Sequence, residues 1–116
     1  MNDEIRKAAI EVMNQMIAHP IANDFIEPIQ PGDDMQDYFE IIKNPRDLTS
    51  IKNNLIENKY NCVQAWIDDV ELVWANAEQY YPPDSHQIVI AAECRRLFAK
   101  HKHSVDALSM GTWCGE

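Results

Sequence analysis

The segment from His19 to Pro45 limits the possible folds most strongly, because no regular helix can run through it. The residues that interrupt it are Pro20, Pro28, Pro31, Gly32 and Pro45. It is nevertheless rich in apolar and aromatic side chains, namely Ile21, Phe25, Ile26, Ile29, Met35, Tyr38, Phe39, Ile41 and Ile42. A loop this long is uncommon in a compact domain and is usually functional. Its apolar content predicts that it packs against the rest of the chain, with room for a short helical turn.

Elsewhere in the chain, apolar side chains recur at three- and four-residue spacing, which is typical of amphipathic helices. This pattern predicts four helices, over residues 3–18, 47–57, 63–80 and 85–103. The chain has no alternating pattern of the kind that predicts a strand, and residues 107–116 carry no period and are expected to fray. The predicted fold class is therefore all-α, a four-helix bundle with one long loop between the first two helices.

The starts of these helices carry residues that cap helices well. Asn2 or Asp3 can cap the first helix, Asp47 the second and Ser85 the fourth. These side chains support the predicted boundaries independently of the apolar pattern.

The third predicted helix carries four large aromatic side chains in two different settings. Trp66 and Trp74 lie at helical spacing along it and are expected in the core, whereas Tyr80 and Tyr81 end it. In an antiparallel bundle, the connection that follows Tyr81 lies at the same end as the start of the long loop. The two connections can therefore enclose a cavity between helices, a usual place for a ligand site.

The charge of the chain favours a cationic partner. The formal net charge is −9, which makes nucleic acid a poor direct partner, because phosphate binding needs clusters of Lys and Arg. A basic peptide tail matches this charge better, although acidity can also serve only to keep a chain soluble. The carboxylates are concentrated between His19 and Ile42, a stretch that contains no Lys or Arg: Asp24, Glu27, Asp33, Asp34, Asp37 and Glu40.

Several other classes of protein find no support in the sequence. No apolar run approaches the roughly 20 residues of a membrane-spanning helix, and the first residues lack the layout of a signal peptide. Cys62, Cys94 and Cys114 are far apart, so neither a zinc site nor a disulfide framework is predicted. A reducing compartment is the expected location on this basis.

Two stretches of the chain resemble the bromodomain family of acetyl-lysine readers. They are DYFEIIKNPRDLTSIKNNL, from Asp37 to Leu55, and DDVELVWANAEQYYPPDS, from Asp68 to Ser85. The resemblance covers about residues 3–104 and identifies residues 1–116 as a single such domain. It implies a left-handed four-helix bundle, with helices named Z, A, B and C, a long ZA loop and a short BC loop.

The resemblance also implies the residues of an acetyl-lysine pocket. Phe25 matches the aromatic residue at the start of the shelf that the ZA loop forms beside the pocket. Ile29, which follows Pro28, matches the valine that forms one wall of the pocket. Tyr38 matches the tyrosine whose hydroxyl reaches the acetyl carbonyl through a water. Tyr80 matches the tyrosine that ends helix B.

Three positions depart from the family pattern. Tyr81 stands where the family has an Asn that donates to the acetyl carbonyl, Gln87 replaces the apolar or aromatic gatekeeper, and Arg46 replaces a Met. The spacing supports this alignment, since Ala91 and Phe98 fall ten and seventeen residues after Tyr81, where the family has an Ala and an aromatic residue.

The departures leave alternatives open. The Tyr81 ring fills the slot if it points inward, and it can stack on the peptide if it swings outward. The Gln87 amide can partly replace the lost donor, but a solvated surface position is the favoured interpretation. Arg46 can pair with a nearby carboxylate and tie the loop down, and Asp68 and Asp69 are expected to be solvated or to support their helix.

The leading functional hypothesis is a binding module for acetylated lysine in basic, histone-like tails, with weakened or altered selectivity. The resemblance implies a nuclear role in chromatin and transcription, and a monomeric domain without cofactor or metal. Asp33, Asp34 and Asp37 are expected to attract the basic peptide at the rim of the pocket.

Two other functions compete with this hypothesis. In the first, a degenerate bromodomain makes protein–protein contacts without binding acetyl-lysine, and a Tyr81 ring packed into the cavity would favour it. In the second, the chain is an enzyme such as a deacylase. The sequence disfavours an enzyme, because it shows no nucleophile–base spacing or metal cluster.

Overall fold

A computed structural model describes residues 2–27 and 37–108. Their regular elements are all helical and are, in chain order, α1 (Asp3–Ala18), η1 (Pro20–Phe25, a 3-10 helix), α2 (Tyr38–Ile41), α3 (Leu48–Ile56), α4 (Val63–Tyr80), α5 (His86–His101) and α6 (His103–Leu108). The predicted all-α bundle is confirmed over these residues, and η1 and α2 are helical turns within the long loop.

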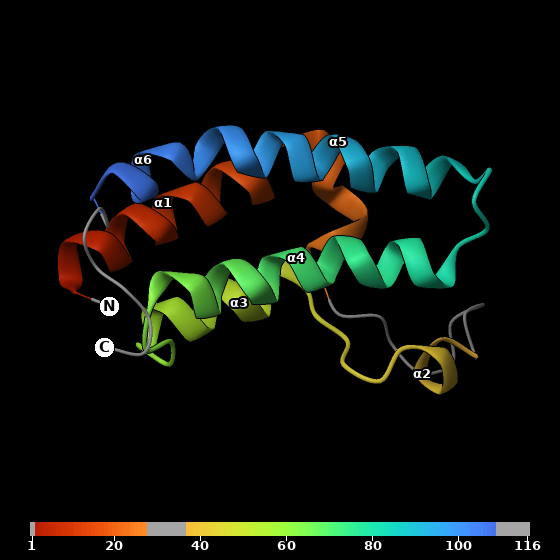
Figure 1. Cartoon of the computed structure of the whole chain (residues 1–116), viewed down its shortest axis with the longest axis horizontal. Coiled ribbons are helices and arrows are strands. Elements are labelled where there is room, and N and C mark those ends of the chain that lie inside the picture. Colours follow the sequence, from red (N-terminus) through yellow and green to blue (C-terminus); the bar gives the residue numbers. More distant parts are fainter. Residues whose placement is uncertain (1, 28–36, 109–116) are drawn as a thin grey trace.

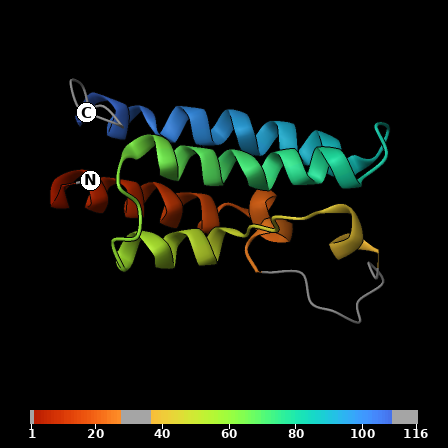
Figure 2. The same cartoon turned by 60° about the horizontal axis from the view of Figure 1, so that its bottom comes forward.

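The bundle has an elongated arrangement of nearly parallel helix axes. α1, α5 and α6 lie together along one side, and α3 and α4 lie along the other (Figure 1). α1 packs against α3 and α5, and α4 packs against α5 and α3. α2 lies beyond the end of α3, beside the last turns of α4 (Figure 2). The long loop and the connection between α4 and α5 therefore meet at one end of the bundle.

Local capping explains where the helices begin. The Asn2 carboxamide oxygen accepts a hydrogen bond from the Ile5 amide at 2.8 Å, and the Asp47 carboxylate accepts one from the Ser50 amide at 2.9 Å. Ser85 is the N-cap residue of α5, as predicted, but its side chain makes no capping hydrogen bond. The first two caps each satisfy a backbone donor that a helix start would otherwise leave unpaired.

The core lies between α1, α3, α4 and α5. Both tryptophans of α4 are fully buried, as predicted, and each ring meets one aromatic partner edge-to-face at 5.3 Å. Trp66 contacts Phe98 of α5, and Trp74 contacts Phe25 of η1. The second contact connects the core directly to the long loop.

The structure adds one helix and corrects one expectation about the cysteines. The chain turns at Lys102 into α6, which buries Val105 and ends at Leu108. Residues 109–116 lie outside the described residues, and the fraying expected of residues 107–116 stays a prediction. Cys62 is disulfide-bonded, against the expectation of no disulfide, whereas Cys94 is a free and buried thiol. Within residues 2–27 and 37–108, no helix is both long and apolar enough to cross a membrane.

Candidate functional site

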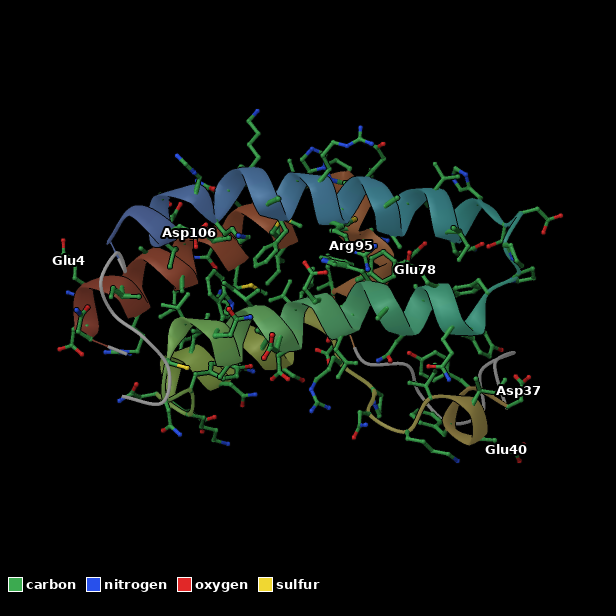
Figure 3. The ribbon with its side chains drawn as sticks, in the orientation of Figure 1. Glu4, Asp37, Glu40, Glu78, Arg95 and Asp106 are labelled. Atoms are coloured by element: carbon green, nitrogen blue, oxygen red, sulfur yellow. The ribbon has the colours of Figure 1, made fainter. Side chains whose placement is uncertain are left out.

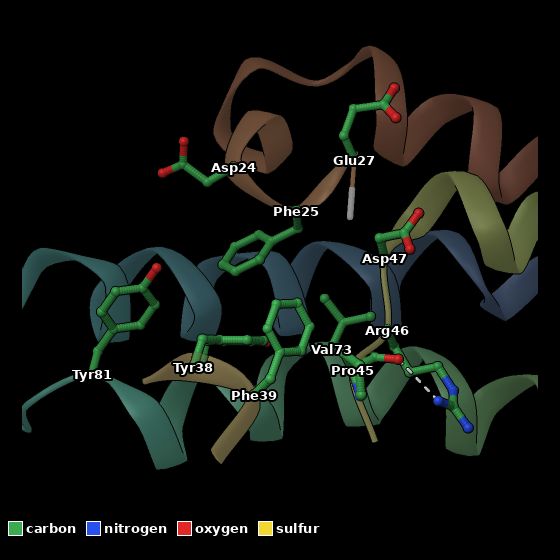
Figure 4. Close-up of a pocket in the computed structure, with 11 residues that line it drawn as sticks. Asp24, Phe25, Glu27, Tyr38, Phe39, Pro45, Arg46, Asp47, Val73 and Tyr81 are labelled. Carbon is green, nitrogen blue, oxygen red and sulfur yellow. Dashed lines mark hydrogen bonds between the residues drawn. The ribbon is translucent and has the colours of Figure 1, made fainter. Parts of the chain in front are cut away.

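A cavity of about 120 Å³ opens at the end of the bundle where the two connections meet. Its walls come from η1, α2, the segment before α3, and one face of α4 (Figure 4). The lining residues are Asp24, Phe25, Glu27, Tyr38, Phe39, Pro45, Arg46, Asp47, Val73, Ala77 and Tyr81. The cavity therefore combines aromatic and apolar walls with tyrosine hydroxyls and a partly acidic rim.

The structure brings some of the predicted site residues together and leaves others aside. Phe25, Tyr38 and Tyr81 line this one cavity, although they come from three different elements. Tyr80 and Gln87 are not among its lining residues. Of the remaining predicted positions, Pro28, Ile29, Asp33 and Asp34 lie outside the described residues.

Tyr81 turns its side chain toward the cavity. It is the C-cap residue of α4, with φ −83° and ψ 149°, and its amide donates to the Ala77 carbonyl at 3.0 Å. From there the half-buried side chain extends toward η1 and packs against the edge of the core (Figure 4). Burial, followed by the nearby Asp24 carboxylate, raises the pKa of the Tyr81 hydroxyl. The Tyr81 side chain therefore borders the cavity.

Tyr38 forms the most enclosed aromatic wall of the cavity. Only 5% of its surface is exposed, and burial, with a smaller effect of Tyr81, raises the pKa of its hydroxyl. The hydroxyl therefore stays protonated near neutral pH and can donate a hydrogen bond. The Tyr38 ring meets those of Phe39 and Tyr80 edge-to-face, with centroids 5.4 and 5.0 Å apart. Such contacts stabilise ring positions beyond simple burial.

Three side chains near the end of α4 fasten the long loop to the bundle. Asn76 donates to the Asn44 carbonyl at 2.9 Å, and Gln79 donates to the Ile41 carbonyl at 3.2 Å. The Tyr80 hydroxyl donates to the Asp37 carboxylate at 2.7 Å. Because residues 76, 79 and 80 share one face of α4, they hold the segment 37–44 along the helix, and we call this set the loop tether.

The loop tether gives Tyr80 and Asp37 roles that the sequence did not reveal. Tyr80 stands beside the cavity rather than in its wall, and the hydrogen bond to Asp37 raises its pKa to about 12. Asp37 lies at the start of α2, next to the end of α4 (Figure 3). Its carboxylate was expected to face a peptide but accepts the Tyr80 hydrogen bond. The spacing of residues 76, 79 and 80 places them on one helix face, but it does not identify their partners in the loop.

A second anchor holds Arg46, which lines the cavity. Its Nε donates to the Asp69 carboxylate at 3.1 Å, and its Nη1 donates to the Pro45 carbonyl at 2.9 Å. The other Asp69 oxygen accepts the Tyr60 hydroxyl at 2.8 Å. The expectation that Arg46 pairs with a carboxylate is confirmed. Asp69 was expected to be solvated or to support its helix. Instead, it links the long loop to α4 through its contact with Arg46.

The Tyr60–Asp69 contact predicts a change of stability at high pH. Burial is the main cause that raises the pKa of Tyr60 to about 12, and the Asp69 hydrogen bond adds to it. A tyrosine in the unfolded chain ionises near pH 10. Between about pH 10 and 12, the Tyr60 hydroxyl is therefore protonated in the folded state but ionised in the unfolded state. The contribution to the free energy of unfolding is complete below about pH 10 and is lost as the pH rises toward 12. Urea unfolding near pH 9 and pH 11 should therefore show a smaller alkaline loss for Tyr60→Phe than for wild type; equal losses would contradict this assignment.

The electrostatics of the cavity rim are mainly acidic. Asp24 and Glu27 are exposed carboxylates, and Asp47 is engaged as the cap of α3. The one cation among the described lining residues, Arg46, is paired with Asp69. Within the described ranges, no group of His, Cys, Asp and Glu side chains is arranged to hold a metal ion.

Comparison with known proteins gives consistent matches. The family model described as Bromodomain matches residues 10–93. "Bromodomain-containing factor 2" of Saccharomyces cerevisiae is 31% identical over 99 residues, which cover 84% of this chain and 15% of that protein. "Transcription factor GTE9" of Arabidopsis thaliana is 28% identical over 109 residues, covering 93% of this chain and 16% of that protein.

A third relative is identified by its name as part of a complex. It is "SWR1 complex bromodomain subunit bdf1" of Schizosaccharomyces pombe, 32% identical over 75 residues, which cover 64% of this chain and 13% of that protein. The chain thus spans only a small part of the length of each of these relatives.

Proposed function

The chain belongs to the bromodomain family, and on that premise we propose that it binds acetylated lysine in basic, histone-like tails through the cavity at the end of the bundle. The observation that carries this proposal is the meeting of Phe25, Tyr38 and Tyr81 around one small cavity. The bromodomain is a non-catalytic reader module, so the proposed role is binding alone. Relatives named as a transcription factor and as an SWR1 complex subunit support a role in chromatin and a nuclear location.

The chemistry of acetyl-lysine fits this cavity. Acetylation removes the charge of lysine and leaves a neutral amide. Such a group needs an apolar slot for its methyl and a donor for its carbonyl. Phe25, Val73 and Ala77 supply apolar walls, and the Tyr38 hydroxyl supplies a protonated donor. A volume of about 120 Å³ suits a small head group rather than a large ligand.

Tyr81 is proposed to weaken this binding or alter its selectivity. We propose that it takes the position of the family's Asn donor, which is supported by its place among the lining residues of the cavity. Leaving a buried carbonyl without its partner costs about 1–3 kcal/mol, or roughly 5- to 150-fold in affinity. The Tyr81 hydroxyl is itself a donor, but it lies farther from its backbone than an Asn amide would.

The acidic loop is proposed to favour basic peptides. Asp24 and Glu27 present exposed carboxylates at the rim, and the Asp37 carboxylate accepts a hydrogen bond from Tyr80. We propose that Asp33 and Asp34 add to this field. Charges of this kind mainly speed association with a partner of opposite charge.

Calorimetric titration with matched tail peptides, acetylated and unmodified, tests the proposal. We expect wild type to bind the acetylated form more tightly. Tyr38→Phe removes only the hydroxyl donor and is expected to reduce the affinity for the acetylated form by about two- to tenfold. Wild type that binds both peptides equally would refute acetyl-lysine reading.

That negative result would favour a second function, in which a bromodomain fold serves as a protein–protein interaction module. The place of the Tyr81 side chain at the border of the cavity is the observation that favours it. The same titrations separate the two functions, because only the first requires a difference between acetylated and unmodified peptides.

A further inference from the structure

A second hollow in the surface runs between η1 and the first turns of α5, with a volume of about 520 Å³. Ile21 and Asp24 contribute one wall from η1. Val89, Ile90 and Glu93 contribute the opposite wall from α5. Val89 and Ile90 lie four and three residues before Glu93, so each shares a helix face with it. We call this hollow the η1–α5 groove.

The groove adjoins the cavity described above at one residue. Asp24 lines both of them. Its exposed carboxylate points away from the Phe25 ring, which lines the cavity but not the groove (Figure 4). A chain that leaves the cavity on this side would therefore enter the groove directly.

The walls of the groove combine apolar side chains with carboxylates at two places, and Asn23 and His86 are its other polar lining residues. Val89 is 58% exposed, whereas Ile21 and Ile90 are partly buried against the core. Asp24 lies on one side, and Glu93 on the other contacts Arg96 at 3.1 Å. That pair is a surface contact between neighbouring helix turns, which holds a carboxylate only weakly.

Asp24 and Glu93 both line the groove, and the buried Cys94 thiol lies near both carboxylates. Burial, with contributions from Asp24 and Glu93, raises the pKa of this thiol to about 11. Its Sγ also donates to the Ile21 carbonyl at 3.7 Å, so Cys94 joins α5 to η1 beneath the groove. Two negative charges from different elements therefore converge on one stretch of apolar surface.

We propose that the η1–α5 groove holds an arginine or lysine side chain that flanks the acetylated lysine in the same peptide. This inference rests on the proposed function, and it narrows the ligand to acetylated peptides with a nearby basic residue. The aliphatic stem of such a side chain covers Val89 and Ile90, and its charged head meets Asp24 and Glu93, since long basic side chains commonly divide in this way. An extended peptide advances about 3.3–3.6 Å per residue, so the basic residue lies within about three positions of the acetyl-lysine.

The test compares acetylated peptides with Arg or citrulline at each of the three flanking positions on both sides. Citrulline keeps the shape of arginine and removes its charge. Titrations use wild type, Glu93→Gln and Glu4→Gln. Glu4 is the matched control, because it is exposed, carries the same charge and lies at the opposite end of the bundle (Figure 3).

At one flanking position, citrulline is expected to weaken binding to wild type by about two- to fivefold, the effect of a partly exposed ion pair. Glu93→Gln should reduce this difference, because only Asp24 then remains to pair with the arginine, and Glu4→Gln should preserve it. An equal effect of the two variants would overturn the proposal, because charge would then act only at long range. Tighter binding of a leucine than of an arginine at that position would also overturn it, since the occupant would be apolar.

Failure of the groove is distinguishable from failure of the proposed function. Each peptide is also measured without acetylation, and that comparison tests the cavity alone. The Arg–citrulline difference in wild type and Glu93→Gln tests the groove alone. Where the heat of binding is too small, the amide chemical shifts of Val89 and Ile90 provide the second readout. Shifts that do not saturate with the arginine peptide would overturn the proposal.

Discussion

Replacement of Tyr81 by Asn is expected to tighten the binding of acetylated peptide by about 5- to 30-fold, or about 1–2 kcal/mol. The smaller side chain opens the slot that the Tyr81 ring now borders, and its amide supplies a donor for the acetyl carbonyl. The helix end does not depend on Tyr81, because the following Pro82 stops α4 in either case. Thermal stability should fall only modestly, since the ring is half-buried at the edge of the core. Calorimetric titration of both proteins with acetylated and unmodified peptides measures the effect.

Tyr81→Phe is the control for this prediction. It keeps the ring and removes the hydroxyl, so it neither opens the slot nor adds a donor, and it should not show the gain of Tyr81→Asn. If Tyr81→Asn binds acetylated peptide no better than wild type, or binds it more weakly, then Tyr81 is itself a ligand contact. If neither protein distinguishes acetylated from unmodified peptide, the interaction-module function replaces acetyl-lysine reading.

Trp74→Ala is expected to lower the free energy of unfolding by about 3–5 kcal/mol and also to weaken peptide binding. Trp74 is fully buried and supports the Phe25 ring at 5.3 Å, and Phe25 lines the cavity. Loss of the indole leaves a void behind this wall, so η1 loses the contact that positions Phe25. Urea unfolding measures the first effect, and titration with acetylated peptide under folding conditions measures the second.

Trp66→Ala is the matched control on the same helix. Trp66 is equally buried and meets Phe98 at the same centroid distance, but neither residue lines the cavity. The two variants should lose similar stability, and only Trp74→Ala should lose affinity beyond the unfolded fraction. Equal affinities in the folded proteins would contradict the proposed support of Phe25. Should either alanine variant fail to fold, the pair Trp74→Phe and Trp66→Phe makes the same comparison at lower cost in stability.

The helices could be predicted closely from the sequence because their signals are local. The apolar period of α1 and α4 and the caps at Asn2 and Asp47 depend only on residues within one or two helical turns. Burial of both tryptophans follows from the same period. The short α6 lacked such a signal, since its burial rests mainly on Val105.

The site was predictable only in part, because its contacts join residues that are far apart in the sequence. The resemblance to bromodomains indicated Phe25, Tyr38 and Tyr81, and the structure places these three around one cavity. The pairing of Tyr80 with Asp37 depends on how α2 lies against α4, which no local pattern specifies. The η1–α5 groove likewise arises only when distant segments fold together.

The loop tether has a consequence for the entropy of binding. Asn76, Gln79 and Tyr80 fix the segment 37–44 through its own carbonyls and the Asp37 carboxylate, with no ligand present. Ordering a residue's backbone costs about 1–2 kcal/mol. Because the segment 37–44 is already ordered in the folded chain, this cost is part of the free energy of folding and does not reduce the affinity for peptide. The wall that carries Tyr38 is thus preorganised, and a peptide that enters the cavity loses mainly its own freedom.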